Sequence, residues 1–177
     1  MNRSELGAAI FAASHLTGTF TLRSGAVSHE YFDKYLFESD PQLLAAIAQQ
    51  LAPHVPDGID ALAGLETGGI PLAVMLSQAT GLPTLFVRKE AKTYGTAKLA
   101  EGPPIENRRL LIIEDVVTSG GQVIASTQDL RERGATVEHA VCVIDRQAGG
   151  REALAEHGVN LTPLFTMTEL HALGNIP

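Results

Sequence analysis

The chain contains 177 residues, of which 45% are hydrophobic and 19% are charged. This length and composition favour one globular domain and argue against a disordered or coiled-coil chain. With 13 basic and 20 acidic residues the net charge is -7, which argues against a broad basic face for nucleic acid. A tightly bound anion would therefore need a local basic cluster.

The sequence also suggests where the protein resides. No apolar stretch approaches the ~20 residues that cross a bilayer, and the first five residues do not resemble a signal peptide. The single cysteine, Cys142, lies inside an apolar run, so no intrachain disulfide can form. We expect a cytoplasmic protein in which Cys142 is a buried core thiol, with a catalytic nucleophile as the less favoured alternative.

Short β-rich apolar runs alternate with helical patterns along the chain. Helices are expected near residues 4–16 and 41–51, the second with Asp40 as its N-cap. Downstream, strands are expected at 59–63, 84–87, 110–114, 137–145 and 160–165, and helices at 71–80, 122–133 and 151–157. Several of these strands are apolar on both faces, and the three later helices each end at a glycine. The alternation predicts an α/β fold with an open, mostly parallel, twisted sheet flanked by helices.

The one long irregular stretch covers residues 92–108 and contains glycines, prolines and many polar side chains. A connection of this length inside a compact domain is usually a functional lid or a disordered segment. We favour a lid.

The most informative pattern lies at 110–122. A buried strand delivers two adjacent acids and leads into a hydroxyl- and glycine-rich turn before a helix, in the order Glu114, Asp115, Val116, Val117, Thr118, Ser119, Gly120, Gly121 and Gln122. In open α/β sheets ligands bind at the carboxyl ends of the strands, and the turn offers N–H groups to a phosphate. Because carboxylates repel phosphate, the two acids fit sugar hydroxyls or a divalent cation. The segment therefore predicts a binding site for a ribose 5-phosphate group.

This segment resembles the phosphoribosyl-diphosphate (PRPP) motif of the type I phosphoribosyltransferases, in which two acids and two apolar residues precede Thr-Ser/Ala-Gly. It lacks the Lys-Ser/Thr of a nucleoside-triphosphate loop and the G-x-G-x-x-G of a dinucleotide site. A second segment, 88–98, holds four of the 13 basic residues and could be a diphosphate clamp or only a solvated loop. Its order, Arg-Lys-Glu-x-Lys-x-Tyr-Gly, is similar to the catalytic loop of orotate phosphoribosyltransferases.

Three further segments agree with that subfamily. They are 18–25 with the following Tyr31-Phe32-Asp33, the loop 64–73, and Ile144-Asp145-Arg146-Gln147. The resemblance covers about 18–158 and implies the type I phosphoribosyltransferase fold as a single domain, 1–177. It also implies a small N-terminal hood at about 1–40 and a mobile catalytic loop at 92–108.

The resemblance implies specific roles for individual residues. Those that bind PRPP would be Arg23, Arg88, Lys89, Lys92, Tyr94 and the run from Glu114 to Gln122, with Lys89 and its neighbours offered by a partner subunit. Those that bind orotate would be Tyr31, Phe32, Thr118 and Arg146, and the catalytic residues Lys89, Lys92 and Asp115. The guanidinium of Arg146 suits the carboxylate of orotate, because it can form two parallel charge-assisted hydrogen bonds.

The implied reaction transfers the ribose 5-phosphate of PRPP to orotate, giving orotidine 5'-phosphate and diphosphate in pyrimidine biosynthesis. The resemblance also implies a homodimer that shares its catalytic loops, and Mg²⁺ carried by PRPP near Glu114 and Asp115. The alternatives are a purine phosphoribosyltransferase, which would not need the Asp145-Arg146 segment, and a non-catalytic PRPP-sensing regulator, which would need a nucleic-acid-binding face.

Two positions depart from the pattern of some family members. Gly68 stands where some bacterial enzymes carry Lys, so one diphosphate contact is absent or is made by backbone N–H groups. Tyr94 stands where others have His, and a tyrosine with its ordinary pKa of about 10 is a poor acid or base at neutral pH.

Overall fold

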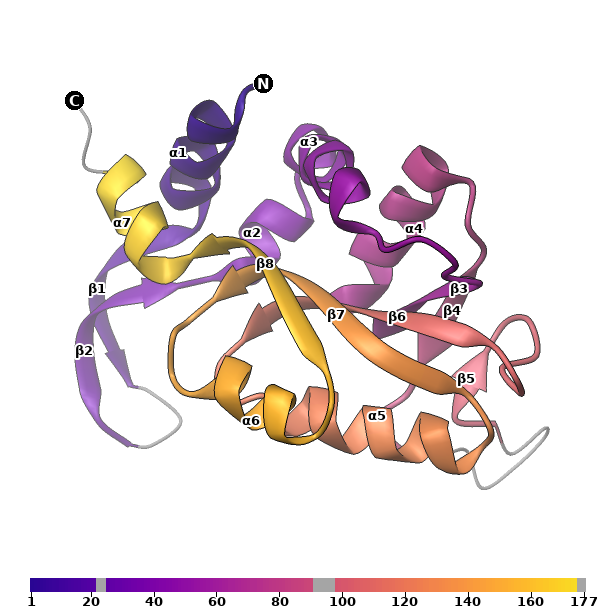
Figure 1. The fold of residues 1–177 in the computed structure, drawn as a ribbon. Coiled ribbons are helices and arrows are strands. Elements are labelled where there is room, and N and C mark those ends of the chain that lie inside the picture. The colour runs from indigo at the N-terminus through magenta and orange to yellow at the C-terminus, as the bar shows by residue number, and fades with distance from the viewer. Residues whose placement is uncertain (22–24, 91–97, 175–177) are drawn as a thin grey trace.

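A computed structural model describes residues 1–21, 25–90 and 98–174. Its centre is a six-stranded sheet in the order β5-β4-β3-β6-β7-β8 (Figure 1). All neighbouring strands are parallel except β5, which is antiparallel to β4. The strands are β3 (Ala61–Leu65), β4 (Thr84–Val87), β5 (Ala100–Glu101), β6 (Arg109–Val117), β7 (Thr136–Asp145) and β8 (Asn160–Thr166).

Helices cover both faces of this sheet (Figure 1). One face packs against α1 (Arg3–Ser14), α3 (Pro41–Leu51), α4 (Gly69–Thr80) and α7 (Met167–Gly174). The other packs against α5 (Gly121–Glu132) and α6 (Gly150–Glu156). Two apolar cores result, one on each side, and the central strand β6 contributes Leu111 and Ile113 to the first and Leu110 and Ile112 to the second. This is the alternation of faces that a strand buried on both sides produces.

The first 40 residues lie at one end of the sheet. After α1 the chain forms an antiparallel hairpin of β1 (His15–Thr21) and β2 (Val27–Phe32), and then the short helix α2 (Lys34–Glu38). In Figure 1 the hairpin stands beside the sheet at the end where α7 also lies. These elements form the segment that the sequence predicts as a hood.

The predicted α/β architecture is confirmed. Asp40 caps α3 as expected, because its side chain accepts hydrogen bonds from the amides of Gln42 and Leu43. Some described elements were not expected: the β1–β2 hairpin, α2, the 3-10 helix η1 (Ala52–His54), β5 and α7. The hairpin escapes periodicity analysis because most of its side chains are exposed on both faces, and the first predicted helix ends two residues early, at Ser14, because His15 and Leu16 belong to β1.

Cys142 is fully buried in the middle of β7. This burial confirms the expected core role, and it also raises the pKa of the thiol well above the ordinary value, which disfavours a thiolate nucleophile. Within the described ranges, no helix is both long and apolar enough to span a membrane.

Candidate functional site

The loop after β6 forms the first part of the site. A cavity of about 170 Å³ is lined by Glu114 and by the residues from Val116 to Val123. Gly120 has a φ of 78°, a conformation that glycine adopts at little cost, and it is the N-cap residue of α5. A Cβ atom there would come within 3.1 Å of the Gly150 carbonyl oxygen. The tight turn therefore depends on glycine and places the amino end of α5 and the hydroxyl residues Thr118 and Ser119 at this cavity, which is the kind of site that binds anions.

The two acids of this segment lie at the end of β6 and are buried. Only 1% of the Asp115 side chain is exposed, and its Oδ2 atom lies 2.5 Å from the ammonium nitrogen of Lys34 on α2. Burial disfavours the charged form of Asp115, but hydrogen bonds from Glu38, Glu114 and Lys34 outweigh it and lower the pKa of Asp115.

Glu38 and Glu114 bind their protons more tightly than exposed glutamates do. Burial, followed by the nearby charge of Asp115, raises the pKa of Glu114 well above its ordinary value. Burial and the hydrogen bond to Asp115 raise the pKa of Glu38 to about 8. At neutral pH the cluster therefore consists of the Asp115 carboxylate, the Lys34 ammonium and at least one protonated carboxyl group, on Glu38.

Gly68, at the amino end of α4, presses against this cluster. A Cβ atom at position 68 would overlap Asp115 Oδ2 and lie 2.8 Å from Glu38 Oε1. At Gly69 a Cβ atom would overlap the carbonyl oxygen of Ile113 on β6. Two consecutive glycines thus allow the loop before α4 to lie directly on β6, with no room for a longer side chain at position 68.

A second cavity, of about 290 Å³, lies beside the first and shares lining residues with it. It is lined by Lys34, Tyr35, Glu66, Thr67, Lys89, Glu114, Asp115, Val116 and Gln122. The amide of Lys89 donates a hydrogen bond of 2.9 Å to Glu66 Oε2. Lys89 of this chain thus lines the cavity that contains its own Asp115, and the contribution of a partner subunit to this site stays a prediction.

The remaining residues that are expected to bind PRPP are distributed as follows. Arg88 pairs with Glu101 at an Nε–Oε1 distance of 3.5 Å and lines a neighbouring cavity, which shares Glu66 and Thr67 with the second one. The structure therefore does not bring Arg88 into the cavity of Asp115. Arg23, Lys92 and Tyr94 lie outside the described residues.

A third cavity, of about 180 Å³, brings together three of the four expected orotate residues, Tyr31, Phe32 and Arg146. The fourth, Thr118, lines the first cavity, after β6, instead. Arg146 directly follows β7, and its amide donates a hydrogen bond of 2.9 Å to the carbonyl oxygen of Val117 at the end of β6. This backbone hydrogen bond places Arg146 beside the end of β6, the strand that carries Glu114 and Asp115.

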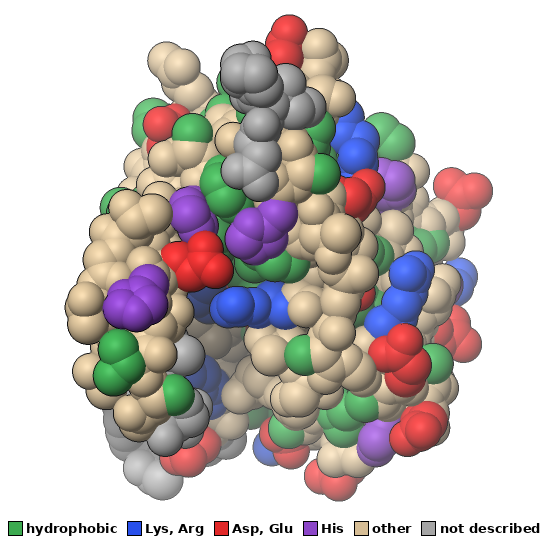
Figure 2. Space-filling view, turned by 90° about the vertical axis from the view of Figure 1, so that its left-hand side faces the viewer, with side chains coloured by type: hydrophobic (Ala, Val, Ile, Leu, Met, Phe, Trp, Pro, Cys, Tyr) green, Lys and Arg blue, Asp and Glu red, His purple; other side chains and the backbone are tan. Residues whose placement is uncertain are grey.

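The rest of this third cavity is lined by His15, Ser28, Glu30, Met167 and His171. His15 Nε2 lies 2.8 Å from Glu30 Oε2, and this hydrogen bond is the main reason that the pKa of Glu30 is lowered. Figure 2 shows the face formed by the hairpin and α7, where histidine, acidic and basic side chains surround a hollow. The sequence did not single out these histidines, because no ligand or catalytic spacing connects them.

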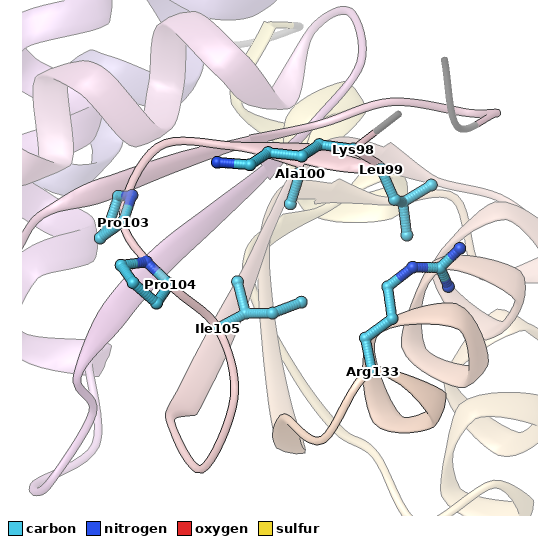
Figure 3. A pocket seen from close by; sticks show the side chains of 7 residues that line it. All are labelled: Lys98, Leu99, Ala100, Pro103, Pro104, Ile105 and Arg133. Atoms are coloured by element: carbon cyan, nitrogen blue, oxygen red, sulfur yellow. The ribbon is translucent and has the colours of Figure 1, made fainter. Parts of the chain in front are cut away.

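A further cavity of about 250 Å³, shown in Figure 3, lies away from the acids. Its lining combines apolar side chains with two basic ones, Lys98 and Arg133. Figure 3 shows that the head groups of these two residues point to different ends of the cavity. The two head groups therefore do not converge on one point of the cavity.

Two functional candidates were missed by sequence reasoning. Lys34 and Glu38 both lie on α2 and reach Asp115, and Lys34 is 81 positions away from it in sequence. No local pattern marks either residue. Only the preceding Asp33, whose side chain accepts a hydrogen bond from the amide of Tyr35, signals that a helix begins there.

Comparison with known proteins agrees with this geometry. Residues 38–160 match the family described as phosphoribosyl transferase domain. An orotate phosphoribosyltransferase from Nocardioides sp. is 54% identical over 169 residues, which cover 96% of this chain and 94% of the relative. The structure of Mycobacterium tuberculosis orotate phosphoribosyltransferase with Fe(III) dicitrate has a TM-score of 0.86 at 27% identity, covering 95% of this chain and 98% of that one. The structure of the same enzyme with PRPP has a TM-score of 0.82 at 25% identity, covering 96% and 98%. The chain therefore belongs to the phosphoribosyltransferase family and, within it, to the orotate phosphoribosyltransferases.

Proposed function

We propose that this chain binds PRPP across the two cavities at the end of β6 and transfers its ribose 5-phosphate to orotate held beside Arg146. The products are orotidine 5'-phosphate and diphosphate, as pyrimidine biosynthesis requires. The observation that carries this proposal is the backbone hydrogen bond from the Arg146 amide to the Val117 carbonyl oxygen, because it places Arg146, which lines the third cavity, beside the end of the strand that carries Glu114 and Asp115.

Each part of the site has a distinct task in this proposal. The turn from Thr118 to Gly121 holds the 5-phosphate through N–H groups and hydroxyls. Asp115 and Glu114 hold the ribose hydroxyls and face the positive charge that grows at the ribose carbon as diphosphate departs. Lys89 and Lys92 stabilise the departing diphosphate. Arg23 and Tyr94 add further contacts to PRPP, and Arg88 does so from the neighbouring cavity that it lines. Tyr31, Phe32 and Thr118 contact the base.

No covalent nucleophile is required in this scheme. Binding both substrates in one orientation and placing fixed charges around the leaving group supply the rate enhancement. Closure of the loop 92–108 would exclude water, which otherwise hydrolyses the activated ribose. The loop's closure remains a prediction.

Mg²⁺ fits this site as a partner of PRPP. Hard cations take oxygen ligands, and Glu114 and Asp115 present carboxyl oxygens at the cavity. Over the described ranges, no group of three or more His, Cys, Asp or Glu side chains could hold a metal, and Asp115 is already paired with Lys34. Substrate oxygens and water would therefore supply most ligands. When bound, Mg²⁺ neutralises part of the diphosphate charge.

The quaternary structure proposed here is a homodimer in which Lys92 and its loop reach the partner's site. Large apolar side chains that remain exposed on α2 and β4, Tyr35, Leu36 and Phe86, support an interface near the cavities. A reducing cytoplasmic location suits a chain whose single cysteine is buried and unpaired.

The two alternatives are less well supported. A purine phosphoribosyltransferase would have no use for a guanidinium beside the base, because purines carry no carboxylate. A PRPP-sensing regulator would need a basic surface for nucleic acid, and the chain has a net charge of -7.

The test is consumption of orotate, followed by ultraviolet absorbance, with purified protein, PRPP and Mg²⁺. We expect Mg²⁺-dependent loss of orotate and a preference for orotate over uracil. Arg146→Ala should lower kcat/KM for orotate roughly tenfold or more, because each charge-assisted hydrogen bond is worth about 1.5–3 kcal/mol.

Arg133→Ala is the matched control, because it removes an exposed arginine at the cavity of Figure 3. It should leave the reaction unchanged. Turnover of adenine or guanine without turnover of orotate would establish the purine alternative, and PRPP binding without any turnover would favour the regulator.

A further inference from the structure

Lys34 lies in an unusual position for a lysine. It is the first residue of α2, and 34% of its side chain is exposed, whereas the Asp115 carboxylate that it pairs with is almost fully buried. The ammonium group therefore faces Asp115 on one side and the open cavity on the other. The same cavity contains Lys89 and Glu66. A lysine that served only to neutralise a buried carboxylate would not need to line a polar cavity.

The charges around this cavity are poorly suited to a bare polyanion. Among the described lining residues, Glu66, Glu114 and Asp115 carry carboxyl groups, and only Lys34 and Lys89 carry ammonium groups. A diphosphate placed here would be repelled by the ionised carboxylates unless cations contact it directly. The single positive charge of Lys89 does not balance the several negative charges of a diphosphate. The ammonium group of Lys34 is the second positive charge among the described lining residues.

Position 68 cannot supply that cation. A side chain there would overlap Asp115 and approach Glu38, so the loop before α4 contributes only backbone to this part of the cavity. The ammonium that reaches the same carboxylate comes from α2 instead, 2.5 Å from Asp115 Oδ2. A lysine side chain can rotate about its flexible stem between two acceptors without movement of the helix.

We propose that Lys34 is a further diphosphate-binding residue, whose ammonium group passes from Asp115 to the diphosphate of PRPP when the substrate binds. Asp115 then accepts hydrogen bonds from the ribose hydroxyls. No covalent bond changes in this exchange. The identity of the ligand rests on the proposed function.

The test compares Lys34→Met with the wild-type protein by isothermal titration calorimetry. The ligands are Mg²⁺-diphosphate, Mg²⁺-PRPP and ribose 5-phosphate. Methionine keeps the unbranched stem and removes the charge. We expect the variant to bind diphosphate and PRPP roughly tenfold or more weakly and to bind ribose 5-phosphate about as well as the wild type. Arg133→Met removes one positive charge away from the site and should change none of the three affinities.

An equal loss of affinity for ribose 5-phosphate would overturn the proposal, because it would show that Lys34 only maintains Asp115. Unchanged affinity for diphosphate would also overturn it.

A measurement on the wild-type protein remains decisive if the variant does not fold. Acetylation of Lys34, followed by mass spectrometry, should slow severalfold when Mg²⁺-diphosphate is present and much less with ribose 5-phosphate. No protection by diphosphate contradicts the proposal. Both experiments use ligand binding alone, so a wild-type protein that protects Lys34 but consumes no orotate would disprove the proposed function and leave this inference standing.

Discussion

At the residue scale, the central feature is a cluster of four ionisable side chains that are not all charged at neutral pH. They are Lys34, Glu38, Glu114 and Asp115. Lys34 and Asp115 form an ion pair, and the pKa of Lys34 is raised because its interactions with Asp115, Glu38 and Glu114 outweigh the effect of burial. Glu38 Oε1 is buried and has no hydrogen-bond partner among the described residues, which adds to the cost of charging this carboxyl group. The cluster thus keeps one carboxylate charged while a neighbouring glutamate stays neutral.

Glu38 predicts a pH dependence of stability. Its pKa rises from 4.5 to about 8 on folding, so the folded state holds a proton that the unfolded state releases between these values. The contribution of protonated Glu38 to the free energy of unfolding is fully present below pH 4.5 and is lost as the pH rises through 8. Glu38→Gln cannot lose a proton, and its free energy of unfolding should exceed that of the wild type by about 1 kcal/mol or more above pH 8.

Urea denaturation at pH 5 and pH 8.5 measures this difference. Glu132→Gln, an exposed position on α5, controls for the change in net charge and should show no such pH-dependent gain. Parallel stability curves for Glu38→Gln and the wild type would mean that Glu38 is ionised in the folded protein.

At the scale of elements, the site depends on how closely α4 approaches β6. Gly64 on β3 supports the same approach, because a Cβ atom there would come within 2.7 Å of the Gly69 carbonyl oxygen. The helix therefore begins directly above the strand that carries Glu114 and Asp115. A glycine at each contact allows backbone to pack on backbone, and the distance between the two elements sets the position of the carboxylates.

Gly68→Ala tests this packing. The added methyl group overlaps the Asp115 carboxylate, so either the carboxylate or the helix must move. We expect the free energy of unfolding to fall by about 1–3 kcal/mol and PRPP binding to weaken, measured by thermal unfolding and calorimetry. Gly121→Ala adds the same group 3.8 Å from its nearest neighbour, Ser119 Oγ, and its stability should remain near that of the wild type. If Gly68→Ala were as stable as the wild type, the Asp115 carboxylate would be able to move away from the added methyl group without loss of stability.

At the scale of the whole molecule, the proposed function requires an acidic protein to bind polyanionic substrates with a few cations gathered at the carboxyl ends of its parallel strands. Strand β6 lies at the centre of the sheet, with β3 on one side and β7 on the other. Its carboxyl end therefore receives the loop before α4 from one neighbour and Arg146 from the other. The overall net charge of -7 is compatible with this arrangement because electrostatic interactions between exposed charges are screened within about 8–10 Å at physiological salt.

The proposed dimer predicts complementation between two inactive variants. Lys92→Ala removes the cation that we propose each loop offers to the partner's site, and Asp115→Asn removes the carboxylate that we propose binds ribose. If each site takes Lys92 from the partner, mixing the two variants under conditions of subunit exchange should restore part of the activity, because a mixed dimer contains one site with both residues. Light scattering coupled to size-exclusion chromatography checks the dimer. Lack of restored activity in a mixture that does exchange subunits would place Lys92 in its own chain's site.

The sequence by itself determined the fold class and the phosphate loop. Both depend on contiguous residues: apolar runs that alternate with helical patterns, and one strand-acid-turn-helix segment from 110 to 122 whose chemistry is local. The tertiary structure decided which residues join that segment. Lys34, Glu38 and Gly68 come from two other elements, and their relation to Asp115 exists only because α2 and α4 pack beside β6. Burial, which sets the protonation of the glutamates, is likewise a property of the packed molecule, because it depends on what the rest of the chain places around each group.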